Sequence, residues 1–281
     1  MATKIGLVGP PNSGKSYSRR HLKGEEVFLL MPSDKLPHLT LTGGAPLKRA
    51  TYSLPNTKTT EETLEVLNSV YDNKYKLRKY MLPHYQDLLK SHGDRLKGLK
   101  VEGDYEVIKH LQYLEAYLWY ISDNMPEKKI VFLPDFTHYI SEIISKKSFI
   151  DQKSGGQAFQ RFWELAGQTL NAFFTQVDEM RDDLFLITEF HSEYEEVEEQ
   201  FKIFVPAGKM LSEKFKPESY YDDLYFTHTL KNEDTNEVAN WVFYVNKYGP
   251  FNARNGWGCK DLYLPNDLNP IISKIRKLKG V

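Results

Sequence analysis

The sequence is poor in cysteine and in long apolar runs. Of its 281 residues only Cys259 is a cysteine, which excludes an intramolecular disulfide and a cysteine zinc site and fits a reducing cytoplasm. No apolar run approaches the roughly 20 residues of a membrane span, so we expect no membrane partner. The formal net charge is only −1, so overall charge predicts neither nucleic-acid nor membrane binding. Any contact with DNA has to come from a local patch.

The remaining composition is ordinary for a soluble globular chain, with 41% hydrophobic and 27% charged residues. Apolar runs predict strands, and apolar residues spaced three and four apart predict helices. Strands are expected at 5–8, 26–31, 128–140, 183–190, 202–205, 224–230 and 241–245, and helices at 15–22, 157–180 and 268–278. We expect one α/β domain over 1–281, with a mostly parallel sheet covered by helices on both faces. A helical insertion at about 60–122 and a β-rich C-terminal part complete it.

The stretch "GPPNSGKS" at Gly9–Ser16 matches the phosphate-loop pattern G-x-x-x-x-G-K-[ST]. Its glycines permit the backbone conformations that point N–H groups at phosphates, and it follows a short predicted strand. Lys15 is expected to reach the β- and γ-phosphates of ATP, and Ser16 to bind Mg²⁺. The expected nucleotide-binding residues are Gly9, Pro10, Pro11, Asn12, Ser13, Gly14, Lys15, Ser16 and Tyr17.

A phosphate loop requires a carboxylate at the end of a neighbouring strand for the Mg²⁺ shell. "IVFLPDF" supplies Asp135 after four apolar residues and a proline. The next residue is Phe136, so the water-activating carboxylate has to come from elsewhere. Asp34, which follows the second strand, is the first candidate, and Glu189 at the end of "LFLITEF" is its rival.

Polar residues also end the strand at 183–190. Thr188 and His191 lie where a γ-phosphate sensor belongs if the protein is an additional-strand ATPase. Thr137 and His138, just after Asp135, are similarly placed. An ordinary surface role for His191 is equally compatible with the sequence.

Four stretches, "GLVGPPNSGKS", "IVFLPDFTHYI", "LFLITEFHSEYEE" and "FNARNGWGCKDLYLPNDLNPIISKI", resemble the RecA-like P-loop ATPases of phages that are linked to single-strand annealing and recombination. The resemblance also covers a Pro-x-Gly-Lys element at 206–209. It implies ATP hydrolysis in a homo-oligomer in the host cytoplasm, where Arg254 would act on the neighbouring subunit's nucleotide. The chain departs from the family in Asp34, which is shorter than the usual Glu, and in the long insertion.

Single-stranded DNA is the first candidate partner, because basic residues alternate with tyrosines over 74–100. The expected contacts are Lys74, Lys76, Arg78 and Lys79. A solvated helix face would have the same composition. Two other classes also remain open. One is a nucleotide or small-molecule kinase, for which no dense arginine cluster is present, and the other is a non-hydrolysing, nucleotide-gated scaffold.

Overall fold

The computed structural model of the chain describes residues 1–30, 62, 65, 66, 69, 115–141, 157–206, 209–231, 235 and 238–281. The strands are β1 Thr3–Val8, β2 Val27–Leu29, β3 Ile130–Leu133, β4 Phe185–Phe190, β5 Ser192–Glu195, β6 Gln200–Ile203, β7 Asp223–Lys231, β8 Val238–Tyr244 and β9 Tyr263–Pro265. The helices are α5 Gln157–Gln176, α6 Lys209–Ser212 and α7 Leu268–Lys279, and the 3₁₀ turns are η1 Ser16–Arg19, η2 Gly24–Glu26, η3 Val177–Glu179 and η4 Pro217–Tyr220.

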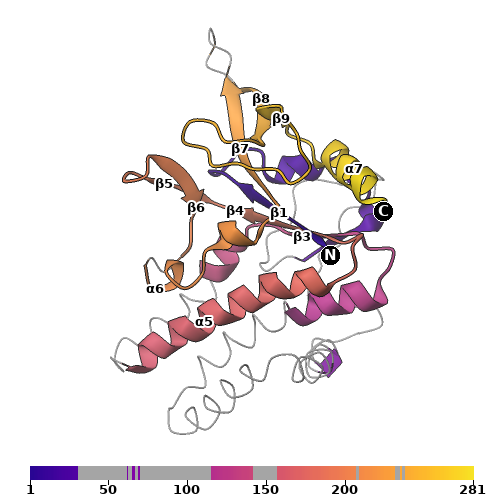
Figure 1. Cartoon of the computed structure of the whole chain (residues 1–281), viewed down its shortest axis with the longest axis vertical. Helices are drawn as coiled ribbons and strands as arrows, with labels where there is room; N and C mark the ends of the chain where they lie inside the picture. The colour runs from indigo at the N-terminus through magenta and orange to yellow at the C-terminus, as the bar shows by residue number, and fades with distance from the viewer. Residues whose placement is uncertain are drawn as a thin grey trace.

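Seven strands form one mixed sheet in the order β2-β3-β4-β1-β7-β8-β9 (Figure 1). The first five are parallel, whereas β8 and β9 are antiparallel to their neighbours. Every residue of β1 and β4 is buried, as expected of central strands in a sheet covered on both faces. Strands β5 and β6 form a separate antiparallel pair.

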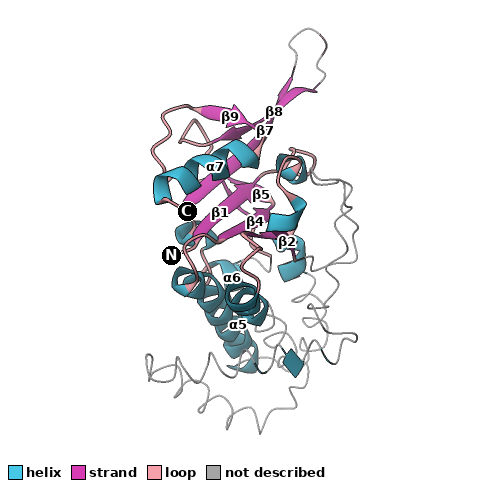
Figure 2. Cartoon of the chain, turned by 90° about the vertical axis from the view of Figure 1, so that its right-hand side faces the viewer, coloured by secondary structure: helices cyan, strands magenta, loops and turns pink. Residues whose placement is uncertain are grey.

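Apolar side chains pack against both faces of the sheet, and α5 and α7 lie on opposite sides of it (Figures 1 and 2). Phe173 and Phe174 of α5 belong to the larger buried cluster. Ile271 and Ile275 of α7 belong to the second cluster, together with Leu22 from the chain just after η1. The expected α/β architecture with a mostly parallel sheet is therefore present.

Several sequence-based boundaries were wrong. A helix was expected over 15–22, but the structure has only the single 3₁₀ turn η1 there. The strand expected through 128–140 ends at Leu133, and a helix begins at Phe136. The proline at 134 explains the break, because it has no N–H for the strand ladder. Strands β5 and β9 were not predicted, since both are short and at least partly exposed.

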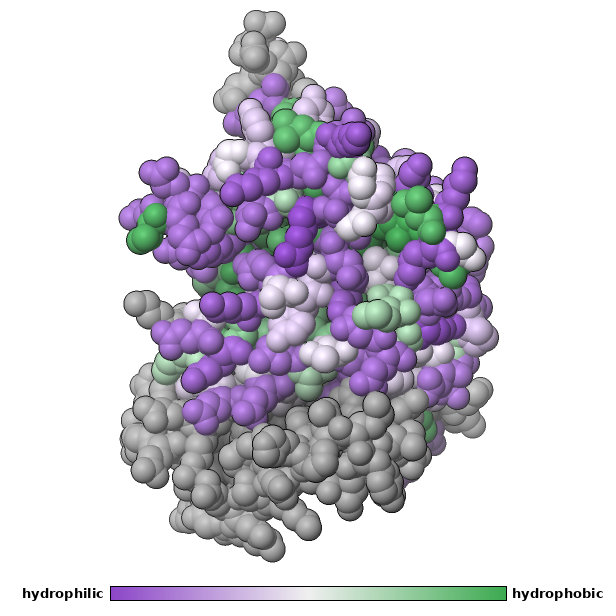
Figure 3. All heavy atoms as spheres, in the orientation of Figure 1, coloured by the Kyte–Doolittle hydropathy of each residue, from purple (hydrophilic) through white to green (hydrophobic). Residues whose placement is uncertain are grey.

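The surface seen in Figure 3 is mainly hydrophilic, and its hydrophobic residues form small separate groups. The most exposed large apolar side chain in the described part of the chain is Val197, between β5 and β6. Among the described residues, no helix has the length and apolar character required to span a bilayer.

Candidate functional site

The candidate site lies at the carboxyl edge of the parallel strands. The loop 9–15 joins β1 to η1, Asp135 follows β3, and Glu189 lies near the end of β4. Strand β4 pairs with β1 on one side and with β3 on the other, and Glu189 is in register with Leu7. The ends of three neighbouring strands therefore bring together the predicted phosphate loop and two of the predicted carboxylates, at the edge where open α/β sheets bind ligands.

Of the two glycines in the phosphate-loop motif, Gly14 has a backbone conformation that favours glycine. Gly14 has φ of 90° and Asn12 has φ of 62°, both in the left-handed region. A Cβ on Gly9 would lie 2.1 Å from Oγ1 of Thr227, so a larger residue at position 9 would displace the loop from β7. Ser13 Oγ lies 2.5 Å from the same Thr227 hydroxyl, which fixes the loop against that strand.

Lys15 is 9% exposed, and its Nζ donates to the carbonyl oxygens of Gly9 at 2.6 Å and Pro10 at 2.8 Å. Burial lowers the pKa of Lys15 from 10.5 to about 8, although the nearby Glu189 and Asp135 carboxylates act in the opposite direction. The ammonium group is thus held inside the loop by two backbone carbonyls, which a phosphate oxygen could replace.

Glu189 is buried and accepts a hydrogen bond from Ser16 Oγ at 3.1 Å. Burial raises its pKa above the usual range, while Arg19, Lys15, the Ser16 hydroxyl and the backbone N–H of Asp135 favour the ionised form. Within the described residues, its Oε1 has no hydrogen-bond partner. The carboxylate therefore touches the predicted Mg²⁺-binding serine and retains an oxygen for a further ligand.

Asp135, the second residue after β3, contacts His191. His191 Nε2 is 3.3 Å from Asp135 Oδ1, and the His191 backbone N–H donates to Thr137 Oγ1 at 2.9 Å. Asp135 also has a positive φ of 51°, which is uncommon outside glycine. Such backbone strain concentrates at functional sites, where the surrounding structure holds it in place.

The structure does not bring every predicted residue to this edge. Thr188 lies on the opposite face of β4 from Glu189, where its hydroxyl shares a hydrogen bond with Tyr221. Arg254 forms a backbone bridge with Leu224, which pairs with Gly6 of β1, and its Nη2 donates to the carbonyl oxygens of Tyr221, at 2.7 Å, and Glu218.

Other predictions fall on residues that the structure does not describe. Asp34 and the proposed DNA contacts Lys74, Lys76, Arg78 and Lys79 lie outside the described residues, as do positions 207 and 208 of the Pro-x-Gly-Lys element. Their roles stay predictions.

Arg19 is a site residue that the sequence analysis missed. It is 2% exposed, its charge acts on Glu189, and its guanidinium carbon lies 5.0 Å from the centre of the Phe132 ring. Its position four residues after Lys15, within the predicted helix, was the available signal. The attraction between the buried Arg19 cation and the buried Glu189 anion offsets part of the free energy that burying these charges costs.

The residues present fit an ATP·Mg²⁺ group. Lys15 Nζ donates to two carbonyl oxygens of the loop, and Glu189 Oε1 next to Ser16 has no partner among the described residues. Ser16, Asp135 and Glu189 supply hard oxygen donors of the kind that Mg²⁺ prefers, together with phosphate oxygens.

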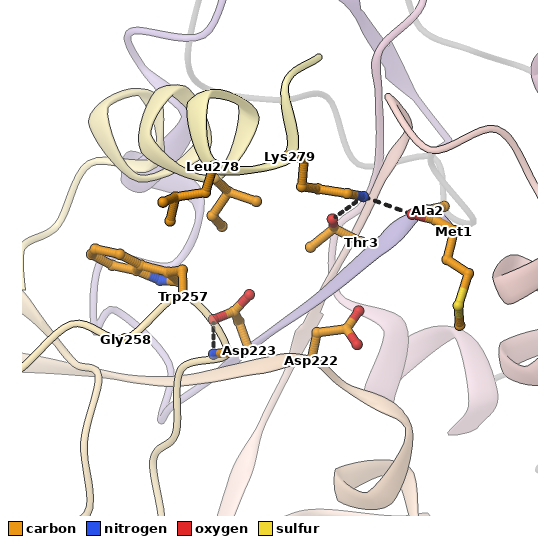
Figure 4. Close-up of a pocket in the computed structure, with 11 residues that line it drawn as sticks. Met1, Ala2, Thr3, Asp222, Asp223, Trp257, Gly258, Leu278 and Lys279 are labelled. Carbon is orange, nitrogen blue, oxygen red and sulfur yellow. Dashed lines mark hydrogen bonds between the residues drawn. The ribbon is translucent and has the colours of Figure 1, made fainter.

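A cavity of about 560 Å³ lies at the other edge of the sheet (Figure 4). Met1–Thr3, Asp222–Asp223 and Gly256–Gly258 line it together with the end of α7. Because β1 begins here and the phosphate loop follows its other end, this cavity is separate from the candidate site. Lys279 Nζ donates there to the Met1 carbonyl at 2.6 Å and to Thr3 Oγ1 at 3.0 Å.

No model of a known protein family matches the chain, and a search of curated proteins finds no significant match. The functional conclusion therefore depends on the residues and geometry of the site itself.

Proposed function

We propose that the protein binds ATP·Mg²⁺ through Gly9–Ser16 and hydrolyses it as a RecA-like ATPase. The observation that supports this most is the contact of Ser16 with Glu189, beside a complete phosphate-loop motif at the end of β1. The position of β4 between β1 and β3 is the order expected of an additional-strand ATPase.

Each side chain has a distinct role in this proposal. The loop N–H groups and Lys15 bind the β- and γ-phosphates, and Ser16 and Asp135 hold Mg²⁺. When bound, Mg²⁺ neutralises charge on the phosphate oxygens. Glu189 orients the attacking water and accepts its proton, since it is a buried carboxylate one contact away from Ser16. His191 lies beside Asp135, where it can donate to the terminal phosphate.

We also propose that turnover is coupled to single-stranded DNA in phage recombination or replication, and that it takes place in a homo-oligomer. The support is the resemblance of the four stretches and the basic, tyrosine-containing segment at 74–100. Glu189 supports hydrolysis over a non-hydrolysing scaffold, because it supplies the carboxylate that Phe136 does not.

The first test is ATP hydrolysis by the purified protein, with and without single-stranded DNA, using Lys15→Ala as the blank. Since Lys15 is the cation inside the loop, this variant should lose at least tenfold in nucleotide affinity and retain its fold. Far-ultraviolet circular dichroism checks the fold, and equilibrium binding of a fluorescent ATP analogue checks the affinity.

Stimulation of hydrolysis by DNA would support the full proposal. Hydrolysis that DNA does not change would overturn the DNA coupling and leave the ATPase. Unchanged ATP binding by folded Lys15→Ala would overturn the site itself. Transfer of phosphate to a small-molecule acceptor in place of water would identify a kinase.

A further inference from the structure

Asn266 is an unusual buried amide beside the phosphate loop. It is 2% exposed, and within the described part of the chain neither its Oδ1 nor its Nδ2 has a hydrogen-bond partner. A Cβ built on Gly14 would lie 3.0 Å from Asn266 Nδ2, so the amide borders the loop directly. Buried polar groups are nearly always hydrogen-bonded, and one without a partner calls for an explanation such as an absent ligand.

Aromatic rings surround the same position. The rings of Tyr17 and Trp241 are 5.0 Å apart between centres, and Arg20 places its guanidinium carbon 4.1 Å from the centre of the Tyr17 ring. A Cβ on Gly14 would be only 2.7 Å from Trp241 Cδ1, and the Trp241 indole N–H also has no partner among the described residues. Tyr17 is 36% exposed, so the cluster meets the protein surface at this ring.

The sheet order determines which part of a nucleotide would reach this cluster. Asp135 and Glu189 follow β3 and β4 on one side of β1, whereas Trp241 and Asn266 come from β8 and the end of β9 on the other. If the terminal phosphate faces the carboxylates, the base has to extend toward β8. Tyr17 directly follows Ser16 on that path.

We propose that Tyr17, Trp241 and Asn266 form the nucleobase subsite, and that Asn266 selects adenine over guanine. The inference rests on the proposed nucleotide-binding function of the loop. An aromatic surface stacks any base, but it does not discriminate between bases. The Asn amide offers one acceptor and one donor, which match the N6 amino group and N7 of adenine. The corresponding edge of guanine presents two acceptors, O6 and N7, and one of them would face the amide oxygen.

The test is competition binding with ATP, GTP, 7-deaza-ATP and inorganic tripolyphosphate against a fluorescent nucleotide. For the unmodified protein, we expect ATP to bind at least about tenfold more tightly than GTP, the size of effect typical of a bidentate base contact. 7-Deaza-ATP should bind several-fold more weakly than ATP, because it lacks the N7 acceptor. These comparisons need no variant.

Asn266→Leu removes both the donor and the acceptor and keeps a side chain of similar shape. The ratio of ATP to GTP affinity should fall about tenfold, whereas the affinity for tripolyphosphate should not change. Asn124→Leu is the matched control, since Asn124 is exposed, precedes β3 at the other edge of the sheet, and donates to the Tyr120 carbonyl. It should leave every affinity unchanged.

Equal binding of ATP, GTP and 7-deaza-ATP by the unmodified protein would overturn the inference, and so would a folded Asn266→Leu protein with an unchanged ratio. If Asn266→Leu does not fold, the three nucleotides decide the question alone. Competition by tripolyphosphate, abolished in Lys15→Ala, would show that the phosphate loop functions even where the base subsite fails. Loss of all nucleotide binding in the unmodified protein would instead overturn the proposed function.

Discussion

Four charged side chains meet at the carboxyl edge, Lys15 and Arg19 against Asp135 and Glu189. Their formal charges cancel, and the three that are nine-tenths or more buried are Lys15, Arg19 and Glu189. Each carboxylate stabilises the cation of Lys15, and Lys15 and Arg19 stabilise the anion of Glu189. A triphosphate would add negative charge to this balanced cluster, so binding should change the protonation of its members.

The pKa of Lys15 gives a pH-dependence prediction. In the free protein this pKa is about 8, and a bound phosphate should raise it because the phosphate favours the ammonium form. ATP affinity should therefore be constant below pH 8 and fall by up to about tenfold per pH unit above it, with one proton taken up on binding. Calorimetry at pH 8.5 in two buffers of different ionisation enthalpy measures that proton.

Lys15→Arg is the control for this titration, because an arginine stays protonated across the range. Its ATP affinity, even if weaker, should show no dependence on pH between 7.5 and 9. A binding enthalpy for the unmodified protein that is the same in both buffers would contradict the assignment.

At the scale of elements, Asp267 caps the N-terminus of α7 and also connects this helix to the chain that follows the phosphate loop. Its N-cap is Asp267, whose Oδ1 accepts from the backbone N–H of Asn269 at 3.1 Å. Oδ2 of the same residue lies 2.6 Å from Nδ1 of His21, just beyond η1. At its other end the helix stops at Gly280, which has φ of 73°.

Asp267→Ala should lower the free energy of unfolding by about 1–2 kcal/mol, because it removes the cap and the contact with His21. Urea denaturation followed by circular dichroism measures the change. Asp267→Asn keeps a capping oxygen and should lose less than half as much. An equal loss of unfolding free energy in both variants would show that the stabilisation comes from the carboxylate charge and not from the capping hydrogen bond.

At the scale of the whole molecule, the Arg254 side chain is engaged by carbonyl oxygens of its own chain and not by the phosphate loop. Within one chain the Arg254 guanidinium donates to the Tyr221 carbonyl, so it does not reach its own loop. A role for Arg254 in catalysis therefore requires a second copy, placed head to tail as in cyclic assemblies.

Mixing two inactive variants tests this arrangement. Lys15→Ala and Arg254→Ala should each lose ATP hydrolysis, and only Lys15→Ala should lose ATP binding. An equimolar mixture, reassembled at random, should recover about a quarter of the unmodified activity, since such sites combine an intact loop with an intact neighbouring Arg254. No recovery in co-assembled oligomers would contradict a role in trans, and full activity of Arg254→Ala alone would remove the residue from the mechanism.

Much of the fold and part of the site could be predicted from local patterns. The buried strands β1, β3 and β4 and the helices α5 and α7 were expected close to where they lie. Thr188 shows where such patterns fail. Successive residues of a strand point to opposite faces, but all six residues of β4 are buried, so no polar alternation reveals that Glu189 and not Thr188 contacts the loop region.

The sequence by itself determined the phosphate-loop motif and most of the regular elements, because glycine positions and apolar periodicity act over a few residues. Only the tertiary structure decided that β4 lies between β1 and β3, so that Glu189 meets Ser16. It also decided that Asn266 borders Gly14, more than 250 positions earlier in the chain. Strand order and such distant contacts depend on the packing of the whole chain, which no local pattern specifies.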